Sequence, residues 1–225
     1  YARGHAAPAA EASPIHPTFA LLDESGANVL DANTPVSTME TCGQCHDTQY
    51  IASHAFHADL GLSECGTASA HSWDLSDGPF GKWNPLTYGL LSAAGDELTD
   101  LSTAGWIMAK AARFVGGGPG VTSRTGEALP TGDPDAENWD WQESGTLEMN
   151  CFVCHLVEPN NDARVQAIRN GDFRQASTAT LLGTGLVSAA GNAFTWNTEA
   201  FTAEGELATV VIQDPTNDNC AQCHG

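Results

Sequence analysis

Three short cysteine motifs constrain this chain more than any other feature of its sequence. Six of its seven cysteines fall into pentads, in which two cysteines are separated by two residues and followed directly by a histidine. The pentads span residues 42–46, 151–155 and 220–224. With this content of cysteine and histidine, random placement would give about 0.01 such pentads. Coincidence therefore does not explain three of them, and a shared chemistry is expected.

The spacing within each pentad is that of c-type haem attachment. Two thiols three positions apart on a helical turn can each add to one vinyl group of the same porphyrin, and the adjacent histidine then binds the iron. Zinc sites usually combine two cysteine pairs within about 15–20 residues, whereas these pairs lie about 105 and 65 residues apart. A thioredoxin-like motif is expected once, near a βαβ pattern. The sequence therefore predicts three covalently attached haems c.

The chain resembles the multihaem c-type cytochromes, a broad group defined by repeated pentads of this kind. The resemblance covers the three pentads and their nearby histidines. It implies thioether bonds and proximal iron ligands from the following residues: Cys42, Cys45 and His46; Cys151, Cys154 and His155; Cys220, Cys223 and His224. The implied fold is mostly irregular loops with short α-helices and few β-strands, wrapped around a covalent haem array. We expect one domain over residues 1–225, with a flexible arm at 1–14 and haem units around 41–60, 149–170 and 215–225.

Each iron needs a second axial ligand, usually histidine or methionine. Histidines outside the pentads supply the candidates: His5, His16, His54, His57 and His71. His54 and His57 lie about 60° apart on a helix that we predict to leave the first pentad at His46 and to end near Gly61. They are expected to serve the second or third haem rather than the haem of His46. Two surface histidines on a polar helix are the alternative.

The other histidines lie in less regular sequence. Pro17 biases His16 toward an extended conformation, which suits a strap that delivers a ligand. His5 lies in the Ala/Pro-rich arm and His71 in a Ser/Gly/Ala-rich loop. Met39 and Met149 are too close to their own pentads to reach the far side of the same haem. Ligation by histidine alone would give lower reduction potentials than histidine with methionine.

A few regular elements are expected between the pentads. Residues 18–30 alternate loosely around a Glu-Ser-Gly turn and predict a hairpin. An amphipathic pattern predicts a helix over 98–114, and a second helix is predicted over 161–169 with an asparagine cap. Residues 207–213 are the clearest strand. Cys65 is the odd thiol, either buried and free or paired with another molecule.

The charge balance excludes some partners. Lys and Arg number 8 against 28 Asp and Glu, a formal net charge of −20. Binding of nucleic acid needs clusters of basic residues, and anionic membrane surfaces are disfavoured for the same reason. No run of 18 apolar residues is present, so no transmembrane segment is expected. Redox proteins, an extracellular electron acceptor or cationic surfaces remain as partners.

Together these features favour electron transfer rather than enzymatic catalysis, because enough histidines are present to saturate every iron. A sharper hypothesis is a homo-oligomer or extracellular filament, since the third pentad lies at the end of the chain and the N-terminal arm carries spare histidines. The alternatives are a multihaem oxidoreductase with one open haem site, or a haem subunit of a larger respiratory or photosynthetic complex. The resemblance implies attachment of haem outside the cytoplasm, and therefore a periplasmic, surface-bound or secreted protein.

Overall fold

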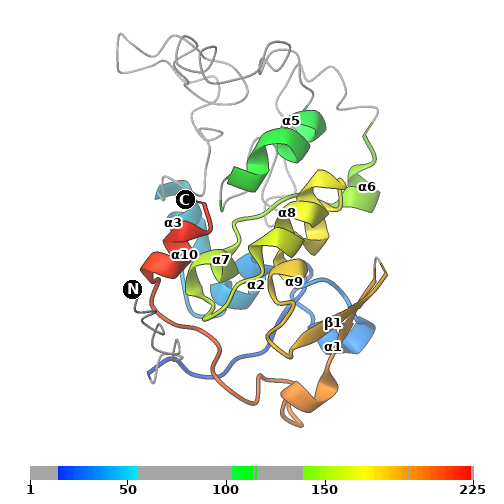
Figure 1. Cartoon of the computed structure of the whole chain (residues 1–225). Helices are drawn as coiled ribbons and strands as arrows, with labels where there is room; N and C mark the ends of the chain where they lie inside the picture. Colours follow the sequence, from blue (N-terminus) through cyan, green and yellow to red (C-terminus); the bar gives the residue numbers. More distant parts are fainter. Residues whose placement is uncertain (1–14, 55–102, 114, 116–138, 192, 224–225) are drawn as a thin grey trace, which may run out of the picture.

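The computed structural model describes residues 15–54, 103–113, 115, 139–191 and 193–223 (Figure 1). Its helices are short: α1 (Val29–Ala32), α2 (Thr38–Gly43), α3 (Thr48–His54), α5 (Thr103–Lys110), α6 (Trp141–Ser144), α7 (Cys151–His155), α8 (Asn161–Arg169), α9 (Ala176–Thr180) and α10 (Asn217–Ala221). Three 3₁₀ turns accompany them: η2 (Ala111–Arg113), η3 (Phe173–Gln175) and η4 (Thr198–Ala200). Strands β1 (Val187–Ala190) and β2 (Ala193–Trp196) pair antiparallel. Among the helices of these residues, none has the length and apolar character needed to span a bilayer.

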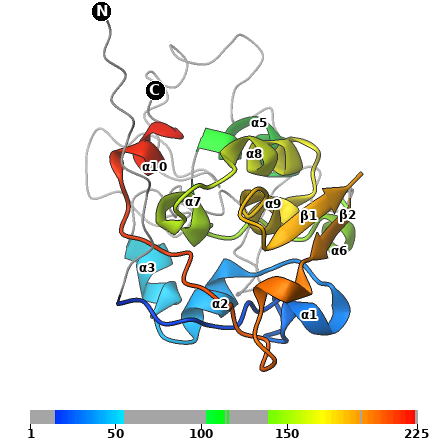
Figure 2. The ribbon, with the colours of Figure 1, turned by 60° about the horizontal axis from the view of Figure 1, so that its bottom comes forward.

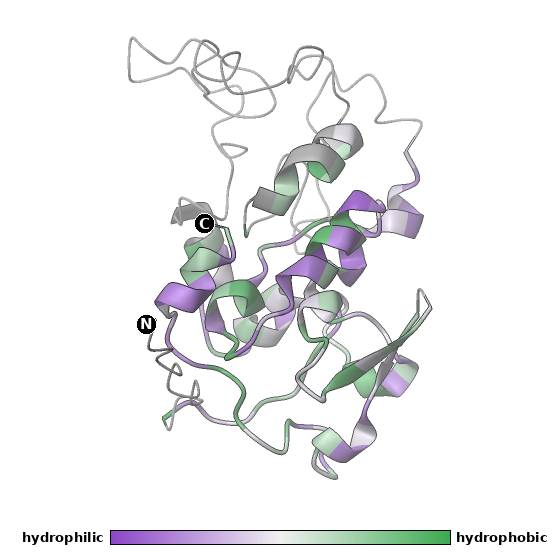
Figure 3. Ribbon diagram, in the orientation of Figure 1, coloured by the Kyte–Doolittle hydropathy of each residue, from purple (hydrophilic) through white to green (hydrophobic). Residues whose placement is uncertain are grey.

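Helix α7, which carries the second pentad, lies at the centre of this arrangement. It packs against α2, α9 and α10 (Figures 1 and 2). Phe152 and Val153, the two residues between its cysteines, are almost completely buried. Figure 3 accordingly shows α7 as hydrophobic, whereas much of α8 is hydrophilic. The middle of the second pentad is thus part of the core, and the helices of the other two pentads flank it.

Hydrophobic clusters join segments that are far apart in the chain. The largest contains the following residues: Leu21, Val29, Val36, Phe152, Leu156, Leu181, Leu186, Val187, Trp196, Phe201, Leu207 and Ile212. A second cluster joins α5, α8 and η3 through Ile107, Ile168 and Phe173. A third contains Met39, Ala52 and Met149, with Cys151 packed against it. Because helices this short are marginal on their own, tertiary packing of this kind must supply most of their stability.

Several elements agree with the sequence predictions. The helix predicted over 161–169 is confirmed with the same bounds as α8, and the Asn160 side chain accepts a hydrogen bond from the Ala163 backbone N–H at 3.0 Å. The helix predicted over 98–114 is confirmed over 103–113, where α5 continues into η2, and the rest lies outside the described residues. The predicted hairpin is a tight turn closed by one antiparallel bridge between Leu22 and Asn28.

One prediction was wrong, and one helix is confirmed with a later start than predicted. Residues 207–213 do not form a strand, because the segment bridges different partners at its two ends: Leu207 pairs with Phe201, and Ile212 with Leu156. The sheet of the described residues is instead the β1–β2 hairpin. The helix predicted to leave the first pentad at His46 begins only at Thr48, because the Asp47 carboxylate accepts a hydrogen bond from the Tyr50 N–H at 3.0 Å and starts α3 there.

Replacing Phe152 by alanine tests the central position of α7. We expect F152A to lower the free energy of unfolding by about 3–5 kcal/mol, because it opens a cavity in the largest cluster. Gln222→Ala is a matched control in the third pentad, where the side chain is exposed, and should change stability by less than about 0.5 kcal/mol. Urea unfolding followed by circular dichroism measures the difference. Equal effects of the two substitutions would contradict a core role for the second pentad.

Candidate functional site

Each pentad sits on a helical turn that begins with a capping side chain. Ser37 caps α2, Asn150 caps α7 and Thr216 caps α10, each accepting a hydrogen bond from a backbone N–H in the first turn. These residue types satisfy the free N–H groups at a helix start. In the first pentad the Cys45 and His46 N–H groups both donate to the Cys42 carbonyl. The second pentad lies wholly within its helix, whereas the first cysteine of the first and third pentads lies near the end of α2 and α10.

The thiols of the first and second pentads meet. A hydrogen bond between the Cys151 and Cys42 thiols, together with burial and the charges of Cys42 and Glu148, raises the pKa of Cys151 well above its usual range. The two helices that carry these cysteines, α2 and α7, pack directly against each other. Residues separated by more than 100 positions in the sequence are therefore brought side by side.

The second and third pentads also meet, at the other end of α7. Burial raises the pKa of the Cys154 thiol, and the nearby Cys220 and Cys223 thiols raise it further. The connection is made by Asn219, which is buried and directly precedes the third pentad. Its amide donates to the Leu156 carbonyl at 2.9 Å and to the Val153 carbonyl at 3.3 Å. Asn219 thereby fastens α10 to α7.

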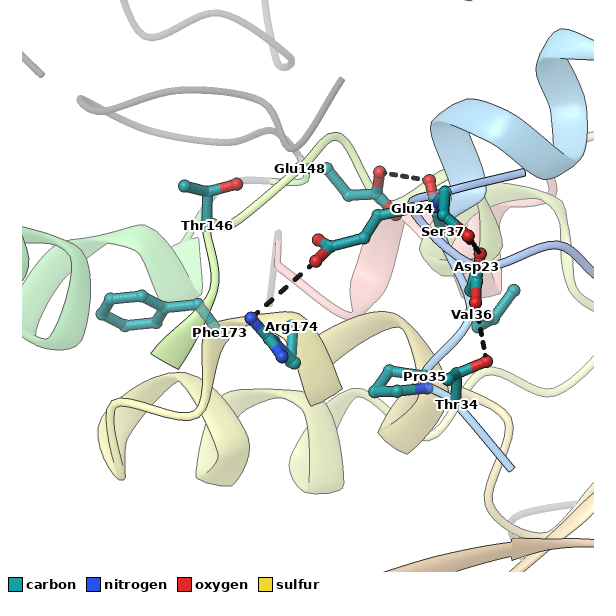
Figure 4. Close-up of a pocket in the computed structure, with 11 residues that line it drawn as sticks. Asp23, Glu24, Thr34, Pro35, Val36, Ser37, Thr146, Glu148, Phe173 and Arg174 are labelled. Carbon is teal, nitrogen blue, oxygen red and sulfur yellow. Dashed lines mark hydrogen bonds and ion pairs between the residues drawn. The ribbon is translucent and has the colours of Figure 1, made fainter. Parts of the chain in front are cut away.

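Glu148 fastens α2 to α7 in a similar way. Its carboxylate is buried and accepts hydrogen bonds at the start of α2 from the Ser37 hydroxyl at 2.8 Å, the Thr38 N–H at 2.5 Å and the Met39 N–H at 3.4 Å. Figure 4 shows the hydrogen bond between Glu148 and Ser37, which both line a pocket of about 200 Å³. A carboxylate at a helix N-terminus interacts favourably with the free N–H groups and the helix dipole.

Arg164 of α8 is a completely buried cation close to the thiols of Cys154 and Cys223. Its guanidinium donates to the Asn161 side-chain oxygen at 3.2 Å and to the Ala112 carbonyl at 3.4 Å. Burial lowers the pKa of Arg164 to about 10, while the two thiols act in the opposite direction. The guanidinium therefore remains charged at neutral pH.

His16 and His46 lie close together, with their rings close to parallel. Their ring centroids are 6.4 Å apart and the ring planes differ by 23°. Metal–imidazole bonds of about 2 Å place the centroids of two rings on opposite sides of one metal about 6.3 Å apart. The strap predicted at His16 thus lies beside His46, the histidine of the first pentad. Contacting aromatic rings without a metal span about 4.5–7 Å, so this distance lies toward the wide end of that range.

Two histidines have one ring nitrogen held by a backbone carbonyl. His16 Nδ1 lies 2.8 Å from the Pro17 oxygen, and His155 Nδ1 lies 3.1 Å from the Gln213 oxygen. A carbonyl oxygen only accepts hydrogen bonds, so Nδ1 must carry the proton and Nε2 keeps its lone pair. This second hydrogen bond is the usual way in which proteins fix the tautomer and orientation of a metal-binding histidine.

The remaining candidates are placed less completely. His54 is the last residue of α3. His5, His57, His71, His224 and Cys65 lie outside the described residues. All six pentad cysteines are free thiols, with Cys45, Cys220 and Cys223 exposed. No group of three His, Cys, Asp or Glu side chains within the described ranges is arranged to hold a bare metal ion.

This donor set fits the group that the pentads predict. It offers free thiols in pairs, histidines with Nδ1 bound to a carbonyl, and the two neighbouring rings of His16 and His46. Sequence reasoning missed Glu148, Arg164 and Asn219. Asn219 gives a weak local signal, as part of the capping box with Thr216, whereas the contacts of the other two carry no sequence motif.

Comparison of the chain with known protein families, curated proteins and solved structures gave no match. The case for function therefore depends on the residues and geometry described above.

Thiol reactivity provides a test of this geometry in the haem-free chain. Iodoacetamide should modify the exposed Cys45, Cys220 and Cys223 before it modifies Cys151, because the thiolate is the reacting form and the pKa of Cys151 is raised. Timed alkylation followed by peptide mass mapping measures the order. Modification of Cys151 as fast as that of Cys220 would contradict the contact between the first and second pentads.

Proposed function

We propose that this protein is a triheme c-type cytochrome that transfers electrons outside the cytoplasm. The observation that carries the proposal is the meeting of the three pentads around α7, with Cys42 beside Cys151 and Cys154 beside Cys220 and Cys223. Haems attached at these thiols would lie with their thioether edges close together. Each haem supplies an iron that accepts and releases one electron. The chain's own part is to fix the haems at short separations.

The pair of His16 and His46 supports electron transfer over catalysis at the first haem. With His46 as the proximal ligand and His16 as the distal ligand, that iron has no open position for a substrate. The hydrogen bond from His16 to the Pro17 carbonyl holds the ring in the tautomer that binds a metal. A multihaem reductase would need one haem with an open distal site. Reductase activity is therefore the second candidate function.

The surface position of the third pentad supports electron exchange with a partner. Cys220 and Cys223 are exposed, as is Gln222 between them. A haem attached there would be accessible to a redox protein, to an extracellular acceptor or to a second copy of this chain. If the protein forms a filament, the partner at this haem is a second copy of the chain. Light scattering that gave a strict monomer, together with three low-spin irons, would remove its support.

Haem content is the first test. Intact mass and a pyridine haemochrome assay on protein purified from cells able to attach c-type haem should give three haems per chain. We expect Cys151→Ser with Cys154→Ser to reduce the count to two and leave the other pentads loaded. Protein that carries no haem under these conditions would overturn the proposal. The pentad cysteines would then be interpreted as metal ligands or disulfide partners.

A second test concerns the distal ligand. His16→Ala should open one iron, so that the reduced variant binds one carbon monoxide per chain while the wild-type protein binds less. Phe19→Leu is the matched control and should behave as the wild type. It keeps His16 but alters the edge contact between the His16 and Phe19 rings, whose centroids are 5.4 Å apart. The reduced-minus-CO difference spectrum measures binding. Unchanged carbon monoxide binding in H16A would show that His16 does not ligate the first haem.

A further inference from the structure

A buried hydrogen-bond network joins the second pentad to the segment that leads into the third. Its two amide side chains are Gln213, which directly follows the bridge between Ile212 and Leu156, and Asn219, which directly precedes Cys220. Gln213 is 6% exposed and Asn219 is 3% exposed. Burying an amide costs free energy unless its polar atoms are hydrogen-bonded. The partners of these two side chains therefore explain why the amides lie inside the protein.

The backbone of Gln213 holds His155 at two points. Its N–H donates to the His155 carbonyl at 2.8 Å, and its carbonyl accepts a hydrogen bond from His155 Nδ1 at 3.1 Å. The end of α7 and the imidazole ring are thus bound to the same residue. Rotation of the ring away from this orientation would break the second hydrogen bond, while the first keeps Gln213 in place.

The side chain of Gln213 holds that backbone in position. Its amide nitrogen donates to the Leu156 carbonyl at 3.3 Å and to the Asn219 side-chain oxygen at 3.1 Å. Leu156 directly follows His155 and is completely buried. Gln213 is therefore bound to two consecutive residues of the second attachment site, and through Asn219 to the helix of the third pentad.

The orientation of the Asn219 amide is fixed by α7. Its nitrogen donates to the Val153 and Leu156 carbonyls, and a carbonyl oxygen only accepts hydrogen bonds. The Asn219 oxygen is therefore the atom that accepts from Gln213, and it also accepts from the Thr216 N–H and hydroxyl at 2.9 Å each. The segment 213–219 is thus fastened to the second pentad at both of its ends.

We propose that Gln213 is a positioning residue for His155, the proximal ligand of the second haem, and that Asn219 makes this position depend on the helix of the third pentad. The inference rests on the proposed function, because it concerns a ligand of the second haem. Outer hydrogen-bond partners orient a metal-binding histidine and raise its basicity. The segment that places the third attachment site therefore also sets the ligand of the second haem.

Gln213→Met tests the inference in the protein loaded with three haems. Methionine is unbranched and of similar length, and it removes both hydrogen bonds that the side chain donates. The Leu156 carbonyl keeps its hydrogen bond from Asn219. Because the ring is then less firmly held, we expect the His155 Nδ1–H to exchange with solvent about tenfold faster. The potential of one haem should also rise, because a less basic ligand stabilises the oxidised iron less.

NMR of the reduced protein labelled with ¹⁵N-histidine measures the exchange of this ring proton, and spectroelectrochemical titration measures the potentials. The signal is assigned by its change in the variant without the second haem, Cys151→Ser with Cys154→Ser. Gln166→Met is the matched control. It removes an exposed glutamine that donates to the Asn170 side chain at 2.8 Å on α8, and it should leave both readouts unchanged.

Asn219→Leu tests the dependence on the third pentad. Although the substitution lies beside Cys220, it should accelerate exchange of the His155 ring proton as Q213M does. The double variant should show no more than the larger single effect, because both substitutions interrupt the same connection. Exchange at the wild-type rate in N219L, or effects that add in the double variant, would overturn this dependence.

Haem counting on each sample separates the inference from the proposed function. A wild-type chain without haem defeats the proposed function. Three haems with a His155 ring proton that exchanges equally fast in Q213M and the wild type defeat the inference alone, and so does an equal acceleration in Q166M.

If Q213M or N219L does not load three haems, the wild-type protein decides. Its His155 Nδ1–H and Gln213 backbone N–H should both be protected from exchange and should become accessible together as urea is added, because they belong to one hydrogen-bonded unit. A ring proton that exchanges freely while the Gln213 N–H stays protected overturns the inference.

Discussion

The packing of α7 against α2 on one side and α10 on the other is the contact on which the rest of the site depends. Phe152 and Val153 are buried in the interior between the two cysteines of the second pentad, so that pentad cannot move without disturbing the largest cluster. The first and third pentads are then fixed relative to it by buried polar side chains, among them Glu148 on the side of α2 and Asn219 on the side of α10. A rigid central motif with polar connections on both sides is a simple way to hold three attachment sites at set separations.

The sequence predicts the chemistry of this site better than its geometry. The pentads identify the thiols and proximal histidines because the spacing itself is the chemical requirement. Pro17 also predicts an extended strap at His16, and the structure brings His16 close to His46. By contrast, nothing local in the sequence indicates that Cys42 would meet Cys151. That contact depends on packing between segments that are far apart along the chain.

The errors in the fold have the same origin. Residues 207–213 have the composition of a strand, but a strand also needs one continuous partner, and here Leu207 and Ile212 bridge different segments. Periodicity predicts a helix that begins at His46. It carries no information on the Asp47 carboxylate, which accepts a hydrogen bond from the Tyr50 N–H and starts the helix later. The α8 helix was predictable to the residue because its asparagine cap is a local signal.

The buried Arg164 is difficult to explain by stability alone. Enclosing a guanidinium costs free energy, as the lowered pKa of this residue indicates, and an apolar side chain of similar volume is often neutral or stabilising at such a position. The same reasoning applies to Glu148, whose capping role could be filled by a neutral acceptor. Both side chains join segments that are far apart in the chain, because Glu148 binds the start of α2 and Arg164 binds the Ala112 carbonyl of η2. Charges kept at a cost at such contacts are more readily understood as specifying how the segments meet than as adding stability.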